Sequence, residues 1–271
     1  MVSELLEALR VPARVGPDLT GRDTADQLGL ADKAAGRRYR DKFLEELPDL
    51  QALLWAEDQR SVLLVLQGMD TSGKDGTIRR VFSGVNPQGV RVASFKAPSA
   101  DDLDHDYLWR VHTAAPSRGE LGIFNRSHYE DVGIVRVLGL VPEQRWRSRY
   151  QHIREFERLL TDEGTTVLKV FLHISRDEQR ERLQKRIDDP AKRWKFNRGD
   201  LDMRARWDDF MSAYEDAMAE TSTDWAPWYV VPADRKWVRD AAVAELLVTT
   251  LRGMKLQPPA AERDLDGIVI E

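Results

Sequence analysis

A glycine-rich loop between a buried strand and a helix constrains the fold of this chain more than any other feature. Residues 61–67, SVLLVLQ, form a short apolar run, as expected of a strand buried on both faces of a parallel sheet. The next residues, 68–77, read GMDTSGKDGT and match the pattern GxxxxGK ahead of a helix-compatible segment. This order of strand, loop and helix predicts a P-loop within an α/β fold.

The rest of the chain repeats the alternation of strand and helix. Apolar runs recur at residues 90–95, 121–125, 167–174 and 228–231, with helix-compatible segments between them. This pattern predicts a doubly wound, mostly parallel sheet of five strands flanked by helices. Residues 1–60 are charged and carry apolar residues at helical spacing between Tyr39 and Leu54. We therefore expect a helical N-terminal extension over residues 1–60 and a P-loop kinase domain over residues 61–271.

The composition excludes several kinds of protein. The chain has no cysteine, so disulfides, thiolate metal sites and cysteine catalysis are excluded. Its net charge of −5 at pH 7 argues against a broad basic surface that coats nucleic acid. No targeting segment is visible, and no stretch approaches the roughly 20 apolar residues that span a membrane. We expect a cytoplasmic protein that binds neither nucleic acid nor membranes.

The residues of the loop predict a binding site for a chain of phosphates. Glycine lets the backbone wrap around phosphate oxygens, and the helix N-terminus adds positive potential. Lys74 is placed to bridge the transferring phosphates, and we assign it as a catalytic residue. The loop residues assigned to substrate binding are Gly68, Thr71, Ser72, Gly73, Asp75, Gly76 and Thr77.

The loop also carries the candidate metal ligand. Asp75 occupies the position at which the usual motif has a Ser or Thr that binds Mg²⁺. The metal must therefore be held differently. Asp70 lies inside the loop, where a carboxylate beside phosphates needs a cation or a proton-transfer role. We assign Asp70 as the ligand of Mg²⁺, with Mn²⁺ as a second candidate ion, or as an activating base. The alternative is an Asp that caps the loop through backbone N–H groups.

Further candidates lie where predicted strands end, the edge at which α/β sheets bind ligands. Arg126 can grip a phosphate bidentately through its guanidinium, and Asn125 precedes it as a neutral ligand. Glu130 and Asp131 follow as available carboxylates, although either can instead complement a helix dipole. Lys96 directly follows the strand predicted at residues 90–95 and is a candidate phosphate ligand.

Residues 176–205 are basic and predict a helical lid. In P-loop kinases such a lid closes over the phosphates, excludes water and adds positive charge. The alternative is an exposed, salt-bridged helix, which acids interspersed near Arg176 and Arg182 favour for that part of the segment. The basic residues of the segment include Arg182, Lys185, Arg186, Lys192, Arg193, Lys195 and Arg198.

Several motifs together resemble the polyphosphate kinase 2 family. They are GMDTSGKDGTIRRV, SFKAPS with HDYLWR, GIFNRSHYEDV, IDDPAKRWKF and WYVVPADRKW. The resemblance runs in the family's order from about Tyr39 to Leu251. It implies a thymidylate-kinase-like P-loop fold, Mg²⁺, and phosphoryl transfer between inorganic polyphosphate and nucleotides. It also implies a homo-oligomer, either a dimer or a tetramer.

The resemblance also assigns roles to matching residues. It implies that Asp70, Lys74 and Arg126 contact the reacting phosphates, with Lys96 alongside. Asn125, followed by RSHYEDV, resembles the subgroup that uses both nucleoside mono- and diphosphates. In that subgroup Glu130 is the extra acid near the acceptor. The residues implied to face polyphosphate from the lid are Arg186, Lys192, Arg193 and Lys195.

These observations predict polyphosphate-driven phosphorylation of AMP or ADP, with GMP and GDP as further candidate acceptors. An ATP-dependent nucleotide kinase is the closest alternative, because it shares the loop, the fold and the lid. A non-catalytic sensor of polyphosphate or nucleotides on a kinase scaffold is an alternative of a different class.

Overall fold

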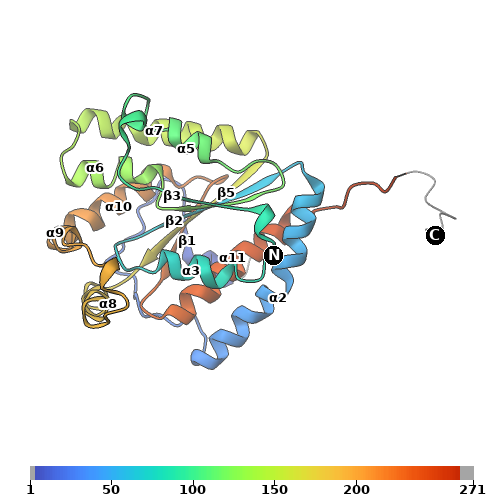
Figure 1. Ribbon diagram of the computed structural model, residues 1–271, viewed down its shortest axis with the longest axis horizontal. Helices are drawn as coiled ribbons and strands as arrows, with labels where there is room; N and C mark the ends of the chain where they lie inside the picture. Colours follow the sequence, from blue (N-terminus) through green and yellow to red (C-terminus); the bar gives the residue numbers. More distant parts are fainter. Residues whose placement is uncertain (1–3, 263–271) are drawn as a thin grey trace.

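A central sheet of six strands organises the computed structural model, which describes residues 4–262 (Figure 1). The strand order is β1-β6-β5-β2-β4-β3, and every neighbouring pair is parallel except β1 with β6. The strands are β1 (Arg10–Val11), β2 (Ser61–Gln67), β3 (Val90–Ser94), β4 (Leu121–Asn125), β5 (Thr165–His173) and β6 (Trp228–Pro232).

The predicted α/β fold with a mostly parallel sheet is confirmed, but the predicted count of five strands is wrong. The additional strand is β1, which pairs antiparallel with β6 through Arg10 with Tyr229 and Val11 with Trp228. Two residues are too few for a recognisable alternation of apolar and polar positions. Val11 is nevertheless fully buried, and β1 covers the edge of β6 that would otherwise be open to another strand.

Helices cover both faces of the sheet (Figure 1). In that view α7 and α10 lie above the sheet, α2, α3 and α11 lie below it, and α8 and α9 lie at one end. The long helices are α2 (Lys33–Glu57), α7 (Glu143–Asp162), α8 (Arg176–Asp188), α10 (Trp207–Thr221) and α11 (Lys236–Met254). The shorter helices are α1 (Glu4–Leu9), α3 (Lys74–Val81), α4 (Ala100–Leu103), α5 (Trp109–Ala114), α6 (Ile134–Val137) and α9 (Gly199–Ala205). Three 3₁₀ turns are η1 (Pro87–Gly89), η2 (His128–Asp131) and η3 (Arg193–Lys195).

The segment predicted as a helical extension contains two helices and one strand. Helix α2 packs along α11, whereas β1 joins the central sheet. A domain boundary at residue 60 stays a prediction, and residues 1–3 and 263–271 of the predicted domains lie outside the described part. Within residues 4–262, every helix is too short or too polar to cross a lipid bilayer.

The register of the sheet places three strand ends side by side. β2 is buried along its whole length because helices cover both of its faces. It pairs on one side with β4, where Leu66 lies beside Asn125, and on the other with β5, where Gln67 lies beside Phe171. The residues that follow β2 and β4 therefore meet at one edge, the carboxyl edge at which such sheets bind ligands.

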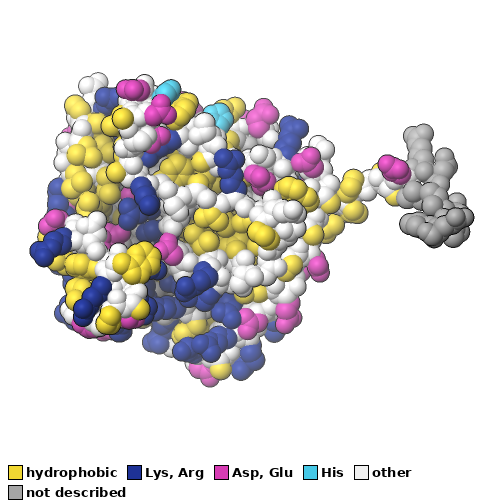
Figure 2. Space-filling model, in the orientation of Figure 1, with side chains coloured by type: hydrophobic (Ala, Val, Ile, Leu, Met, Phe, Trp, Pro, Cys, Tyr) yellow, Lys and Arg dark blue, Asp and Glu magenta, His cyan; other side chains and the backbone are white. Residues whose placement is uncertain are grey.

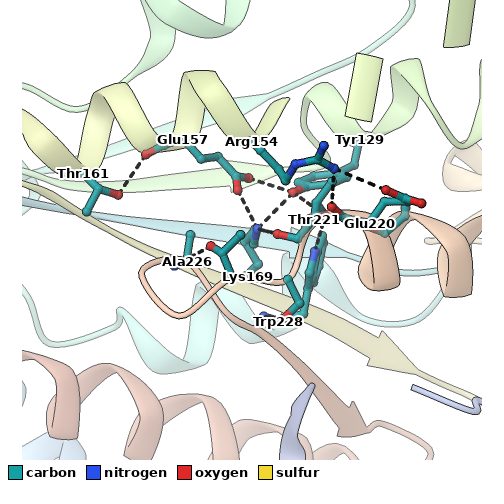
Figure 3. Close-up of polar contacts among 12 residues, drawn as sticks. Tyr129, Arg154, Glu157, Thr161, Lys169, Glu220, Thr221, Ala226 and Trp228 are labelled. Atoms are coloured by element: carbon teal, nitrogen blue, oxygen red, sulfur yellow. Dashed lines mark hydrogen bonds and ion pairs between the residues drawn. The ribbon is translucent and has the colours of Figure 1, made fainter. Parts of the chain in front are cut away.

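A buried polar cluster fixes the turn that follows β4 (Figure 3). Lys169, on β5, has no exposed surface, and its Nζ lies 2.5 Å from Oε2 of Glu157 on α7. The same ammonium donates to the Thr221 carbonyl at 2.7 Å and to the Tyr129 hydroxyl at 3.1 Å. Burial alone would raise the pKa of Glu157, but Lys169 and His128 outweigh it and lower that pKa. Because Tyr129 and His128 belong to η2, the cluster holds the segment between Arg126 and Glu130 in place.

Replacement of Lys169 by Met is expected to lower the free energy of unfolding by about 3–5 kcal/mol, because Glu157 would stay buried without its cation. Urea denaturation followed by circular dichroism measures the change. In Lys169→Met/Glu157→Gln part of the loss should return, since a neutral amide needs no counter-charge. An exposed ion pair contributes about 1 kcal/mol or less to stability. If Lys169→Met lowered the free energy of unfolding by no more than that, the result would contradict this role.

Candidate active site

The loop after β2 has a backbone that glycine makes possible. Gly68 and Gly73 have φ angles of 142° and 106°, and Thr71 also lies in the left-handed region at 66°. A Cβ on Gly73 would lie 1.8 Å from Nη1 of Arg239, and one on Gly68 would lie 2.6 Å from the Leu172 carbonyl oxygen. These glycines are therefore required both for conformation and for space.

Two buried arginines hold this loop from outside. Arg182, on α8, donates through Nη1 to the carbonyl oxygens of Thr71 at 2.9 Å and Ser72 at 3.0 Å. Arg239, on α11, donates through Nη1 to the same Ser72 oxygen at 3.0 Å and pairs with Asp240 at 2.8 Å. The outward carbonyls are thus satisfied by protein donors, and anion binding falls to the N–H groups of the loop.

The sequence did not reveal these roles. Arg239 was not a candidate, although an Arg-Asp pair directly before the apolar run AAVAELLV was the available signal. Arg182 was expected on a lid or an exposed salt-bridged helix. It does pair with Glu178, at 2.6 Å, but only 8% of its surface is exposed and its other contacts reach the loop.

Lys74 begins α3 and points back into the loop. Its Nζ donates to the carbonyl oxygens of Gly68 at 2.7 Å and Met69 at 3.4 Å. Burial and the charge of Arg126 together lower the pKa of Lys74 to about 8, against the opposing carboxylates of Asp70, Glu130 and Asp75. A bound phosphate would favour the charged ammonium, because an adjacent anion raises the pKa of a cation.

Asp70, Arg126 and Glu130 form a row of alternating charge beside Lys74. Nη2 of Arg126 donates to Oδ1 of Asp70 at 2.6 Å, and Nη1 lies 3.9 Å from Oε2 of Glu130. Burial alone would lower the pKa of Arg126, but Glu130 and Asp70 outweigh it and raise that pKa. Burial also raises the pKa of Glu130, although Arg126 and Lys74 oppose the shift. The strand ends thus bring all four predicted catalytic residues together.

Two of the predicted substrate-binding residues, Asn125 and Asp75, contact each other. The Asn125 amide donates to Oδ1 of Asp75 at 2.6 Å, which joins the end of β4 to the first turn of α3. Asp75 therefore has a neutral partner at the position where the usual motif carries a hydroxyl. A second carboxylate in place of Asn125 would repel Asp75.

A small pocket adjoins this row of charges. Its polar side is formed by the loop with Asp70, Arg126 and Glu130. Its apolar side is formed by Ile134 of α6, Met203 of α9, and Phe210 and Tyr214 of α10. The segment from α9 to α10 therefore closes directly onto the catalytic candidates.

The remaining predicted phosphate ligands lie farther out. Lys96 is exposed after β3. Lys192, Arg193 and Lys195 are exposed on or beside η3 and make contacts within the lid, such as Nε of Arg193 with the Ile187 carbonyl at 2.7 Å. Arg186 pairs with Asp200 at 3.6 Å. The structure therefore places these cations around the loop but brings none of them into it.

The donor set suits Mg²⁺ held jointly with substrate. No group of three or more His, Asp or Glu side chains within residues 4–262 could hold a metal by itself. Mg²⁺ is usually bound through one or two carboxylates plus substrate phosphates, and not in an all-protein cage. Asp70, on the phosphate loop itself, is the carboxylate that fits this pattern.

The fold and the site define the class of protein. A buried strand, a glycine-rich loop with an inward lysine, and a helix N-terminus at the carboxyl edge of a parallel sheet make a P-loop phosphate-binding protein. The family model of polyphosphate kinase 2 (PPK2) matches residues 30–259. The chain therefore belongs to the polyphosphate kinase 2 family of enzymes.

Relatives and solved structures agree with this assignment. The chain is 62% identical over 265 residues to an AMP/ADP-polyphosphate phosphotransferase of Meiothermus ruber, covering 95% of this chain and 98% of that protein. It is 48% identical to an ADP-polyphosphate phosphotransferase of Rhodopseudomonas palustris, covering 80% of this chain and 79% of the relative. The crystal structure of polyphosphate kinase 2 from Arthrobacter aurescens TC1 superposes with a TM-score of 0.93 at 44% identity, over 97% of this chain and 94% of that one.

The lowered pKa of Lys74 predicts that the rate of phosphoryl transfer falls at alkaline pH, an alkaline limb in the pH–rate profile. Below a pH of about 8 the free enzyme holds Lys74 charged, and above it the ammonium is lost. Because kcat/KM reports groups of the free enzyme, it should fall with a midpoint near this pH, whereas kcat should fall at higher pH. In Lys74→Arg the permanently charged guanidinium should remove the limb, even though the rate is lower. An unchanged limb in this variant would assign it to another group.

Proposed function

We propose that this protein transfers phosphoryl groups from inorganic polyphosphate to AMP and ADP, with GMP and GDP as further acceptors. The observation that carries the proposal is the meeting of Asp70, Lys74, Arg126 and Glu130 at the phosphate loop. The proposal is supported by the names of relatives that match nearly the whole chain, above all the AMP/ADP-polyphosphate phosphotransferase at 62% identity.

The residues of the site suit a loose, metaphosphate-like transition state, which asks a protein mainly for alignment and neutralisation of charge. The N–H groups of the loop and Lys74 bind the donor phosphates. Arg126, held between Asp70 and Glu130, presents its guanidinium to the transferring group or the acceptor phosphate. An acceptor phosphate oxygen then attacks the terminal phosphorus, and the shortened polyphosphate leaves.

Asp70 is the residue proposed to hold Mg²⁺ or Mn²⁺ together with the substrate phosphates. The ion supplies neutralisation of phosphate charge when it is bound. Lys96 and the lid residues Arg186, Lys192, Arg193 and Lys195 are proposed to contact polyphosphate once the lid closes. The lysines and Arg193 are exposed, which is compatible with this role because exposed cations lose few protein contacts when a segment moves. Arg186 is half-buried and would exchange Asp200 for a phosphate.

The donor distinguishes this proposal from its alternatives. Purified protein with Mg²⁺ and AMP should form ADP and then ATP from polyphosphate, measured by ion-exchange chromatography of the nucleotides. A panel that pairs polyphosphate or ATP with AMP, ADP, GMP and GDP tests both donor and base. Lys74→Ala should lower turnover by about 100-fold or more, as loss of a transition-state donor does. Activity with ATP alone would support the nucleotide kinase, and binding without turnover would support the sensor.

Asp70→Asn tests the metal assignment separately. In this variant the Mg²⁺ concentration that gives the half-maximal rate should rise by about tenfold or more. Mutation of residues that only support a metal ligand already weakens metal binding by about that factor. Glu130→Gln is the matched control, since it weakens the other carboxylate contact of Arg126 without removing the proposed ligand. Its half-saturating Mg²⁺ concentration should stay at the wild-type value. Equal behaviour of the two variants would contradict a metal-binding role for Asp70.

A homodimeric or homotetrameric assembly and a cytoplasmic location stay predictions of the sequence and its family resemblance. Light scattering on the purified protein measures the first.

A further inference from the structure

A basic groove lies behind the phosphate loop, between the N-terminal ends of α2 and α11 and the side of α3. Figure 2 shows Lys and Arg side chains gathered at the lower edge of the molecule, where Figure 1 places these three helices. We call this feature the α2–α11 groove. Its six cations outnumber its two carboxylates, Asp234 and Asp240. The cations are Lys33, Arg37, Arg40, Arg80, Arg235 and Lys236.

The two carboxylates of the groove are already engaged. Asp240 pairs with Arg80 and with Arg239. Asp234 accepts hydrogen bonds from the Ser175 backbone N–H at 2.8 Å and the Thr24 hydroxyl at 2.7 Å. Neither carboxylate is therefore left to neutralise the other cations that line the groove.

Three cations of the groove have no counter-ion. Within residues 4–262, Lys33, Arg37 and Lys236 are exposed and make no salt bridge or hydrogen bond through their side chains. Lys33 and Arg37 lie one helical turn apart and share a face of α2. Unpaired cations that converge on a groove from two helices repel each other unless an anion lies between them. The groove therefore favours a ligand with several negative charges.

The groove continues the positive charge of the phosphate site. Lys236 shares the first turn of α11 with Arg239, and Arg182 donates to the Asp234 carbonyl two residues before Lys236. These two arginines hold the outward carbonyls of the loop. Partial burial of its ammonium, reinforced by these two arginines, lowers the pKa of Lys236. Helix α11 begins at Lys236 without a side-chain cap, so its N-terminal N–H groups add to the positive potential. Arg80 of the groove also lies against the first turn that follows the loop, since a Cβ on Gly76 would lie 3.0 Å from its Nη2. The cations around the loop and those of the groove are therefore adjacent.

We propose that the α2–α11 groove binds the distal phosphates of a polyphosphate whose terminal phosphate lies in the loop. The inference rests on the proposed function and extends it from the reacting group to the rest of the donor. The groove suits a flexible chain that carries charge at every unit. It suits a base less well, because its aromatic residue, Trp237, already packs against Gly36, where an added Cβ would lie 2.1 Å from the ring. Long polyphosphates should therefore bind more tightly than triphosphate, which reaches only the loop.

The double variant Lys33→Ala/Arg37→Ala tests this proposal. It should weaken binding of long-chain polyphosphate by about tenfold, given two lost charge contacts. The ratio of affinities for long-chain polyphosphate and triphosphate should fall correspondingly. The salt dependence of long-chain binding should also decrease, by roughly 1.5 units in the log–log slope for two lost contacts. Affinities come from titration calorimetry with each ligand, and kcat/KM ratios for the two donors give a second measure.

Arg38→Ala/Lys42→Ala is the matched control. It removes the same charge from two exposed positions on α2 that lie outside the groove. This variant should keep the wild-type affinity ratio, and circular dichroism melting should show that both double variants fold. An unchanged ratio in Lys33→Ala/Arg37→Ala, or equal losses in both double variants, would overturn the proposal.

A single-stranded oligonucleotide tests whether the groove binds a different polyanion, a nucleic acid. It should bind the wild type far more weakly than long-chain polyphosphate does. Equally tight binding that the groove variant loses would show a nucleic-acid site and overturn the proposal. Because binding is measured apart from turnover, an absence of phosphoryl transfer contradicts the proposed function, whereas an unchanged affinity ratio contradicts the groove.

Discussion

The grip of Arg182 and Arg239 on the Ser72 carbonyl is the contact on which the site depends. Ser72 lies in the loop after β2, Arg182 on α8 and Arg239 on α11. Ser72 and Arg239 are 167 residues apart in the sequence. Both guanidinium groups are buried, and Gly73 has no Cβ because Arg239 occupies that space. The loop conformation is therefore set by helices on either side of it and not by its own sequence alone.

This grip also couples the two cationic segments of the molecule. Helix α8, the first part of the predicted lid, carries Arg182 at the loop, whereas α11 carries Arg239 at the loop and Lys236 in the α2–α11 groove. The helix that begins the predicted lid and the helix that carries Lys236 are therefore both bound to Ser72.

Local requirements made part of the structure predictable. Gly73 and Lys74 made the loop predictable because phosphate binding needs those residue types at that spacing. The position of Arg126 was predictable because it follows a strand that ends at the ligand-binding edge of the sheet. The bond between Asn125 and Asp75 was not predictable, because it depends on how α3 is rotated against β4. Strand β1 was missed because two residues are too few to show an alternation of apolar and polar positions. Arg239 was missed because its contact with the loop exists only once α11 packs against the loop.

The arrangement of charge, and not its total, determines how an acidic protein can hold a polyanion. The net charge is −5, yet three acids near the loop are paired with cations: Asp70 and Glu130 with Arg126, and Asp240 with two arginines. Paired acids contribute little repulsion at short range, while unpaired cations such as Lys236 dominate the local field. Lys74 shows the same balance, since burial and Arg126 lower its pKa to about 8 and a bound anion would raise it. The site therefore holds its cations at an electrostatic cost that phosphate binding offsets, which favours donors rich in charge over donors that bind through a base.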